Sequence, residues 1–223
     1  RGGVPVIFPQ FAGLGSLPKH GFARTAAWRL MRSGQIDGGA AQAVFALRES
    51  IATIALWPYV FSAELTVTVS GAELDIALAV KNSGDTAFSF TAALHTYCAV
   101  SEIADASVHG LAGLHYRDSA TGADNCMENS TELRIAGEVD RIYAGVPAQL
   151  ELRQPGQTTL ISSTGFNDAV IWNPGAVKGA ALADLEPDGY RRMLCVEAAS
   201  ILHPVHLLPG AGWTGSQRLQ VLD

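Results

Sequence analysis

A histidine and a glutamate in strongly apolar surroundings are the residues of this 223-residue chain best suited to acid–base chemistry. His95 ends the apolar run 92–94, and Glu197 follows the apolar run 193–196. Burying a carboxylate without a partner is costly, and buried ionisable groups are enriched at functional sites. A lone strand histidine is more often a satisfied core residue, and structural ion pairs also bury carboxylates. Residue types alone therefore leave the catalytic and the structural interpretation open.

Three further stretches place polar side chains where a ligand could be held. His20 and Arg24 lie four residues apart around a glycine, beside aromatic side chains and directly after Lys19. Asp168 enters an apolar strand that leaves through Trp-Asn-Pro, and Arg1 precedes a glycine turn. Each stretch also has an ordinary interpretation, as a solvated loop, a strand followed by a turn, or a strand entry.

Other kinds of catalytic centre find little support. The serine-hydrolase pattern GxSxG and the phosphate-binding pattern GxxxxGK[ST] are absent from the sequence. His203 and His206 could suggest a metal pair, but Pro204 suits an edge or a loop, and no acidic or cysteine cluster accompanies them. We therefore favour ordinary strand-edge histidines, and we expect neither a metal nor a cofactor.

The elements that must position these side chains follow a period of two. Residues 64–70 alternate apolar and polar side chains, and residues 73–80 repeat the pattern after a turn at Gly71. Good helical stretches are scarce, which favours an all-β antiparallel sandwich or barrel. The Gly-rich residues 34–41 are expected to form a surface turn. Further short strands are expected at 43–47, 51–56, 87–94, 132–135, 149–154 and 158–162.

Composition limits the class of protein. The chain is 48% hydrophobic and 16% charged, which is typical of a globular protein with a substantial core. Its formal net charge of −6 argues against binding to nucleic acid or to an anionic membrane surface. Cys98, Cys126 and Cys195 are odd in number and widely spaced, which favours reduced thiols in a cytoplasmic protein. No apolar run reaches the ~20 residues that cross a bilayer. With no repeat or linker, residues 1–223 are expected to form one domain.

Seven stretches, taken in order, resemble the glucose-6-phosphate 1-epimerase (hexose-6-phosphate mutarotase) branch of the aldose 1-epimerase superfamily. They are RGGVPVIFPQF (1–11), LPKHGFARTAAW (17–28), LHTYCAVSEI (94–103), GLAGLHYRD (110–118), DAVIWNP (168–174), DGYRRMLCVEAA (188–199) and PGAGWTGSQRL (209–219). The resemblance implies an antiparallel β-sandwich of the galactose-mutarotase-like supersandwich type, in agreement with the period-two pattern. Family members usually carry further strands before the RGG motif, so this chain is expected to lack those N-terminal strands.

The resemblance also implies roles for individual residues. His95 matches the histidine that acts as general acid toward the ring oxygen of the sugar. Glu197 matches the glutamate that acts as general base on the anomeric hydroxyl. His20 and Asp168 match residues that hold sugar hydroxyls.

A second set of matches concerns the substrate. Arg1 and Arg24 match the basic residues that give this branch its preference for a 6-phosphate. Lys19 and Gln10 are carried over as contributors to the same site. The chain departs from many members at Gly175, where they have Trp, and at Cys98, where they have an aromatic residue. Both changes are expected to widen or soften the pocket wall.

The implied reaction is the interconversion of the α and β anomers of a hexose 6-phosphate, expected to be D-glucose 6-phosphate, by acid–base ring opening and reclosure. The expected partner is a small-molecule sugar phosphate, and the expected state is a cytoplasmic monomer. Three alternatives stay open: an epimerase of unphosphorylated sugars, a sugar-phosphate-binding module without turnover, and a truncated, inactive fragment.

Overall fold

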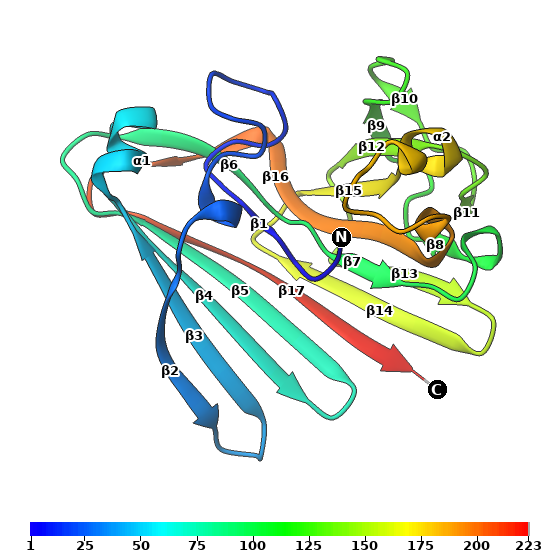
Figure 1. Cartoon of the computed structure of the whole chain (residues 1–223), viewed down its shortest axis with the longest axis horizontal. Coiled ribbons are helices and arrows are strands. Elements are labelled where there is room, and N and C mark those ends of the chain that lie inside the picture. Colours follow the sequence, from blue (N-terminus) through cyan, green and yellow to red (C-terminus); the bar gives the residue numbers. More distant parts are fainter. Residues whose placement is uncertain (223) are drawn as a thin grey trace.

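Two antiparallel sheets form the molecule in the computed structural model, which describes residues 1–222 (Figure 1). The first sheet has eight strands in the order β1-β6-β16-β15-β12-β9-β10, with β7 paired to β16. Its strands are β1 Val6–Ile7, β6 Phe88–Leu94, β7 Tyr97–Ala99, β9 His115–Asp118, β10 Cys126–Met127, β12 Val139–Ala144, β15 Asp168–Asn173 and β16 Met193–Leu207.

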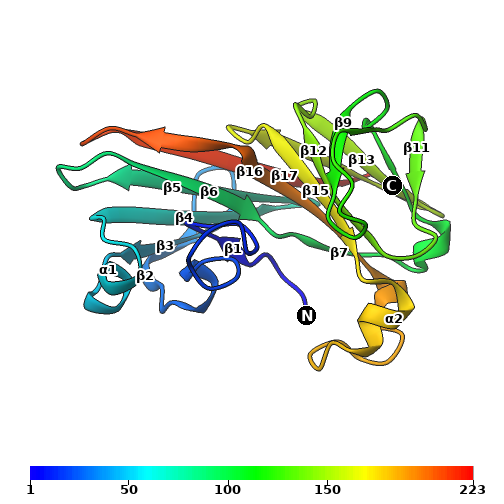
Figure 2. The ribbon, with the colours of Figure 1, turned by 90° about the horizontal axis from the view of Figure 1, so that it is seen from above.

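The second sheet has nine strands in the order β11-β8-β13-β14-β17-β5-β4-β3-β2. They are β2 Arg29–Gln35, β3 Ala41–Arg48, β4 Phe61–Ser70, β5 Glu73–Asn82, β8 Ser107–His109, β11 Glu132–Arg134, β13 Gln149–Gln154, β14 Gln157–Thr164 and β17 Gly212–Leu222. Seen from above, the two sheets form layers, with the long β16 close to β17 of the other sheet (Figure 2). The expected all-β antiparallel sandwich is confirmed.

Most of the expected strands are present, and their turns are as the sequence indicated. β4 and β5 form a hairpin in which Ser70 pairs with Glu73, and Gly71 takes a φ of 55°, a left-handed conformation that glycine adopts without strain. The turn contains fewer residues than the expected range 34–41, because β2 continues to Gln35 and β3 begins at Ala41. The strands that were not expected include those at 29–35, 139–144 and 212–222.

The prediction of a strand at 51–56 is wrong, because these residues form the helix α1 (Ile51–Leu56). Ser50 caps the helix: its Oγ accepts a hydrogen bond from the Thr53 amide at 3.2 Å, and the Thr53 Oγ1 accepts one from the Ser50 amide at 2.7 Å. This reciprocal capping satisfies two amides that a helix end otherwise leaves free. The apolar residues suggested a buried strand, yet Ile51 is 94% exposed.

The remaining helical segments are short. They are α2 (Gly175–Ala180) and 3-10 turns at Ala23–Thr25, Ile103–Asp105 and Gly189–Arg192. None of the helices in residues 1–222 has the length and apolar character of a membrane span. The three cysteines are free thiols, as expected.

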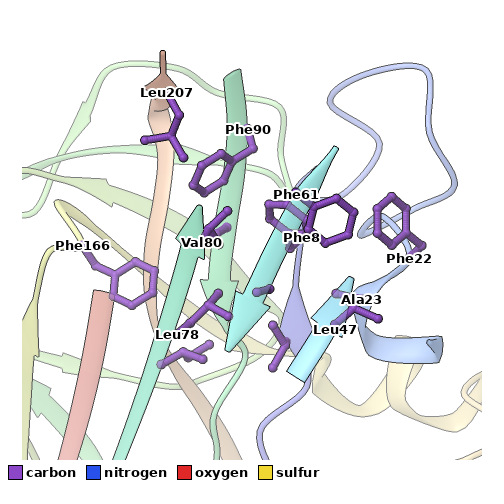
Figure 3. Close-up of a cluster of buried hydrophobic side chains, with 14 of the residues drawn as sticks. Phe8, Phe22, Ala23, Leu47, Phe61, Leu78, Val80, Phe90, Phe166 and Leu207 are labelled. Carbon is purple, nitrogen blue, oxygen red and sulfur yellow. The ribbon is translucent and has the colours of Figure 1, made fainter. Parts of the chain in front are cut away.

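An aromatic cluster fills the space between the sheets at one end of the molecule (Figure 3). The Phe8 ring centre lies 5.2 Å from those of both Phe61 and Phe90, and Trp57 packs edge-on to Phe8 at 5.4 Å. Tilted and edge-on arrangements of this kind are favoured by the charge distribution of aromatic rings. Phe8 lies directly after β1, so its packing in the cluster fixes the chain between β1 and β2 to the sheet.

Candidate active site

A cavity of about 170 Å3 lies on the face of the first sheet that is turned away from the second sheet. Side chains alternate between the two faces of a strand, so Glu197 of β16, Trp172 of β15 and Asp140 of β12 all reach this face. The loop 11–20 closes one side of the cavity, and residues 178–182, which include the end of α2, close another. Four strands of the first sheet, β9, β12, β15 and β16, and two loops therefore supply most of the walls.

His95 and Glu197 face each other in this cavity. Leu94 pairs with Ala198, so His95, one residue beyond the end of β6, lies beside Glu197 on β16. The His95 Nε2 is 3.3 Å from the Glu197 Oε1, and the two side chains are 12% and 1% exposed. The backbone amide of His95 donates to the carbonyl of Pro5 at 3.0 Å, which fixes the chain where β6 ends.

A buried glutamine of the second sheet ties the pair to the rest of the molecule. The Gln217 side chain on β17 accepts a hydrogen bond from the Thr96 hydroxyl and donates to the Val196 carbonyl at 3.0 Å. Thr96 follows His95, and Val196 precedes Glu197. One side chain therefore anchors both backbone segments from behind the cavity.

Burial sets the protonation of the pair. Burial, with a smaller effect from the positive charge of Arg1, lowers the pKa of His95 to about 4. It raises the pKa of the Glu197 carboxyl well above its usual range, and the negative charge of Asp140 acts in the same direction. The two groups lie close enough to titrate as a coupled pair.

Aromatic neighbours and a second histidine orient His95. Its ring stacks on Tyr97 with centres 5.0 Å apart and an interplanar angle of 10°. The ring of His20 lies 5.8 Å away and also lines the cavity. Burial lowers the pKa of His20 to about 3, so this imidazole is neutral, and its Nδ1 accepts a hydrogen bond from the Ala12 amide at 3.3 Å. The Nε2 of His20 is consequently a hydrogen-bond donor.

The predicted phosphate ligands lie at different depths. Arg1 and Lys19 line the cavity, whereas Arg24 does not. The Arg1 Nε donates to the Asp184 Oδ1 at 2.7 Å, and its guanidinium carbon lies 5.9 Å from the centre of the Trp172 ring. Arg24 is exposed and donates to the Lys19 carbonyl at 3.0 Å, so it supports the loop that carries Lys19.

Two of the predicted binding residues do not line the cavity, and their side chains hold backbone segments in place. The Gln10 side chain donates to the Leu17 carbonyl and accepts from the Leu17 amide, which closes the loop 11–20. Asp168 is 1% exposed, and its Oδ2 accepts hydrogen bonds from the amides of Ile201 and Leu202 at 2.7 and 2.8 Å. Asp168 shares the cavity face of β15 with Val170 and Trp172, and its Oδ1 has no partner within residues 1–222, so its contact with the sugar stays a prediction.

The cavity also contains charged residues that the sequence did not indicate. Asp140, Arg117 and Lys178 all line it, and burial raises the pKa of Asp140. Arg117 is 3.3 Å from Asp124, and Lys178 is 2.7 Å from Glu138. Asp140 shares a face of β12 with apolar Ile142. Because the sequence analysis did not predict this strand, a single carboxylate in it could not be recognised as a cavity residue.

Neither of the two positions that depart from the family pattern lines the cavity, and the expected widening stays a prediction. Cys98 follows Tyr97 on β7, packs among the apolar residues between the sheets, and does not line the cavity. Gly175 has a φ of 62°, and a Cβ there would lie 2.7 Å from the Glu138 amide nitrogen. A larger residue at this position would need a different backbone.

His203 and His206 lie in the exposed part of β16. The His206 Nδ1 is 3.0 Å from the Ser89 hydroxyl on the neighbouring strand β6. Neither histidine belongs to a group of three potential metal ligands within residues 1–222. The geometry favours the ordinary strand-edge interpretation.

These positions define what the cavity can do. A carboxyl and an imidazole in contact can remove one proton from a small molecule and deliver another to it. His20 and Asp140 add a hydrogen-bond donor and an acceptor, and the cationic rim attracts an anion. Such an arrangement defines an acid–base enzyme of the mutarotase class.

Comparison with known proteins agrees with this class. The aldose 1-epimerase family matches residues 1–220. A protein of Cenchrus ciliaris, provisionally named glucose-6-phosphate 1-epimerase, is 32% identical over 224 residues, which covers 96% of this chain and 68% of that protein. A provisionally named mutarotase from Salmonella typhimurium has a TM-score of 0.91 at 28% identity, over 100% of this chain and 75% of that one.

A galactose mutarotase related enzyme from Lactobacillus acidophilus shares the fold, with a TM-score of 0.78 at 15% identity over 99% of this chain and 83% of that one. The galactose-mutarotase-like sandwich is therefore confirmed. The chain belongs to the aldose 1-epimerase family.

Proposed function

We propose that this enzyme interconverts the α and β anomers of a hexose 6-phosphate, with D-glucose 6-phosphate as the expected substrate. The observation that carries the proposal is the His95–Glu197 pair, with 3.3 Å between the His95 Nε2 and the Glu197 Oε1 at the wall of a cavity with a cationic rim. The name of the Cenchrus ciliaris relative supports the choice of a 6-phosphate.

The reaction requires two proton movements on one pyranose ring. The Glu197 carboxylate takes the proton of the hydroxyl on C1 while the His95 imidazolium gives a proton to the ring oxygen. The C1–O5 bond breaks, the aldehyde rotates about C1–C2, and the ring closes on the other face as both protons return. No group is consumed, and positioned acid–base groups typically contribute ~10²- to 10⁴-fold each.

The protonation of the pair suits this cycle. A single proton on the pair can lie on the carboxyl or on the imidazole, and the second arrangement is the one with a base and an acid ready. A bound sugar hydroxyl and ring oxygen supply polar partners that the buried pair lacks before binding. We infer that substrate binding favours the charged arrangement.

Lys19 and Arg24 are the residues best placed to respond to the phosphate. Arg1, Arg117 and Lys178 each already have an acidic partner, whereas Lys19 and Arg24 have none within residues 1–222. A phosphate dianion near the cavity mouth gives Lys19 a partner at the wall, and Arg24 adds charge from behind it. The cation that is free before binding contributes most to selectivity, because no existing ion pair must be broken.

The test is anomer-exchange NMR on glucose 6-phosphate and glucose side by side. Arg24→Ala should lower kcat/KM for glucose 6-phosphate roughly tenfold, because it removes a positive charge behind Lys19 and the hydrogen bond that holds the Lys19 carbonyl. Turnover of glucose should change little. Arg32→Ala, an exposed arginine of β2, is the matched control. Equal loss on both substrates would make Arg24 structural and remove the support for a phosphorylated sugar.

The same measurement separates the other functions that the sequence left open. Exchange of glucose in preference to glucose 6-phosphate would identify an epimerase of unphosphorylated sugars. Binding of glucose 6-phosphate without exchange would identify a binding module. We further propose that residues 1–223 form a single domain and act as a monomer in the cytoplasm; light scattering tests the monomer.

A further inference from the structure

A buried cysteine lies next to the acid–base pair and has no part in the proposed reaction. Cys195 is two residues before Glu197 on β16, so both side chains lie on the cavity face of the strand. Cys195 is the partner of Tyr97 in the β7–β16 pairing, and the Tyr97 ring stacks on His95. One ligand atom from each of His95, Cys195 and Glu197 lies within 4.8 Å of the other two.

The polar atoms of this group are not saturated by the protein. Glu197 is 1% exposed, and its Oε2 has no hydrogen-bond partner within residues 1–222. The Nδ1 of His95 is also buried and unpartnered there. Buried polar atoms are nearly always paired, so a carboxylate oxygen left free beside an imidazole and a thiol points to a ligand that accepts electron pairs.

We propose that His95, Cys195 and Glu197 form a binding site for a thiophilic divalent cation, with Zn²⁺ as the expected ion, and that the ion inhibits the enzyme. The inhibitory consequence rests on the proposed function of the pair; the binding does not. Zinc takes thiolate, imidazole and carboxylate ligands in a tetrahedral arrangement, and the fourth position would be open to a water from the cavity.

The distances fit this coordination. Metal–ligand bonds of ~2.0–2.3 Å in a tetrahedral site place the ligand atoms about 3.5 Å apart. The separation of 3.3 Å between the His95 Nε2 and the Glu197 Oε1 already meets that requirement. A shift of the Cys195 Sγ by about 1 Å, through rotation of its side chain, completes the set. His95 and Glu197 line the cavity, so the ion reaches the site from there.

Binding consumes the groups that the reaction needs. The Cys195 Sγ–H loses its proton to solvent as the S–Zn bond forms, and any proton on the pair leaves as well. Zinc remains divalent, and no electron is transferred. The Glu197 oxygen can then no longer accept the proton of the anomeric hydroxyl, and the His95 Nε2 can no longer donate. Mg²⁺ and Ca²⁺ prefer oxygen ligands and should bind poorly.

Two measurements on the purified chain test the site. Cd²⁺ titration should produce the ultraviolet charge-transfer absorption of a cadmium–thiolate bond at one equivalent, and Zn²⁺ should compete it away. Zn²⁺ should inhibit anomer exchange, and Mg²⁺ should not. Cys195→Ala should abolish the absorption and weaken Zn²⁺ inhibition at least about tenfold, the loss caused by removing even an outer-sphere partner.

The controls separate this site from other thiols. Cys98→Ala removes a buried thiol on β7 that packs between the sheets, and it should keep both the absorption and the inhibition. Cys195→Ser keeps the volume of the side chain in case the alanine variant folds poorly. Unchanged Zn²⁺ inhibition in both Cys195 variants, or no Cd²⁺ absorption in the wild type, would overturn the proposal. If the wild type binds Cd²⁺ through Cys195 but exchanges no anomers, the proposed function fails and the metal site stands.

Discussion

The aromatic cluster between the sheets buries only apolar side chains, whereas the cavity on the outer face of the first sheet buries ionisable ones. In the cluster, Phe8, Phe61 and Phe90 are each at most 2% exposed and bury no polar side-chain atom. In the cavity, His95 and Glu197 are almost as buried, yet each has a polar atom without a partner in residues 1–222. Burial of the cluster stabilises the folded protein. The unpaired polar atoms in the cavity lower the free energy of unfolding.

This contrast shows how the molecule supports a costly site. The cavity walls include strands β12, β15 and β16, whose other faces carry apolar residues packed against the second sheet. The rigid sheet keeps the unsatisfied carboxyl where it is, because moving it would disrupt packing on the opposite face. Residues that only the fold needs and residues that only the reaction needs should therefore respond differently to substitution.

The largest effect is expected on catalysis. Glu197→Gln and His95→Asn should each reduce anomer exchange of glucose 6-phosphate by ~10²- to 10⁴-fold, because each removes one proton-transfer group from the pair. Exchange NMR measures the rate, and circular dichroism checks the fold. The exposed Glu186→Gln variant is the control and should keep its activity. Near-wild-type exchange in either site variant would falsify the assigned role.

The second-largest effect is expected on stability, from a substitution in the aromatic cluster. Phe61→Ala should lower the free energy of unfolding by ~3–5 kcal/mol, because it opens a cavity among three aromatic neighbours. The kcat/KM of the folded fraction should stay unchanged, since Phe61 does not line the active-site cavity. Urea denaturation measures the loss, and Phe61→Leu should lose less. A fall in kcat/KM in the folded protein would show that the two regions are coupled.

Substitution of Asp168 tests whether this buried carboxylate serves the stability of the fold or the binding of the sugar. Asp168→Ala leaves the amides of Ile201 and Leu202 without their acceptor, and the free energy of unfolding should fall by about 1–3 kcal/mol. The KM for glucose 6-phosphate should be unchanged, whereas a residue that holds the sugar would raise it. Asp168→Asn, which keeps one acceptor oxygen, should lose less stability. An increase in KM with stability retained would support the sugar-binding role.

The smallest effect is a gain of stability in an inactive variant. The folded-state pKa of Glu197 is raised, so its contribution to stability is complete below the unfolded pKa near 4.5 and is lost as pH rises through the folded value. Gln cannot ionise, so Glu197→Gln should be more stable than wild type by on the order of 1 kcal/mol, with a gain that grows with pH. Urea denaturation near pH 5 and near pH 8 measures it. A gain that shrinks with rising pH would contradict the assigned direction.

Period-two patterns predicted much of the sheet structure. Strands β3, β4, β5 and β6 carry strong alternation and were located within a few residues. The helix α1 was missed because five apolar residues around one threonine match a buried strand as well as a helix turn. Only the reciprocal hydrogen bonds of Ser50 and Thr53 distinguish the two.

The sequence by itself determined the fold class and, through the motifs around them, the two residues that face each other in the cavity. It did not determine which other residues surround the pair, because β12, β15 and β16 are contributed by separate parts of the chain. Asp140 lines the cavity and Asp168 does not, although both carboxylates lie on the same face of the same sheet. How close each carboxylate lies to the pair depends on strand order and register, and both are fixed only by packing in the folded molecule.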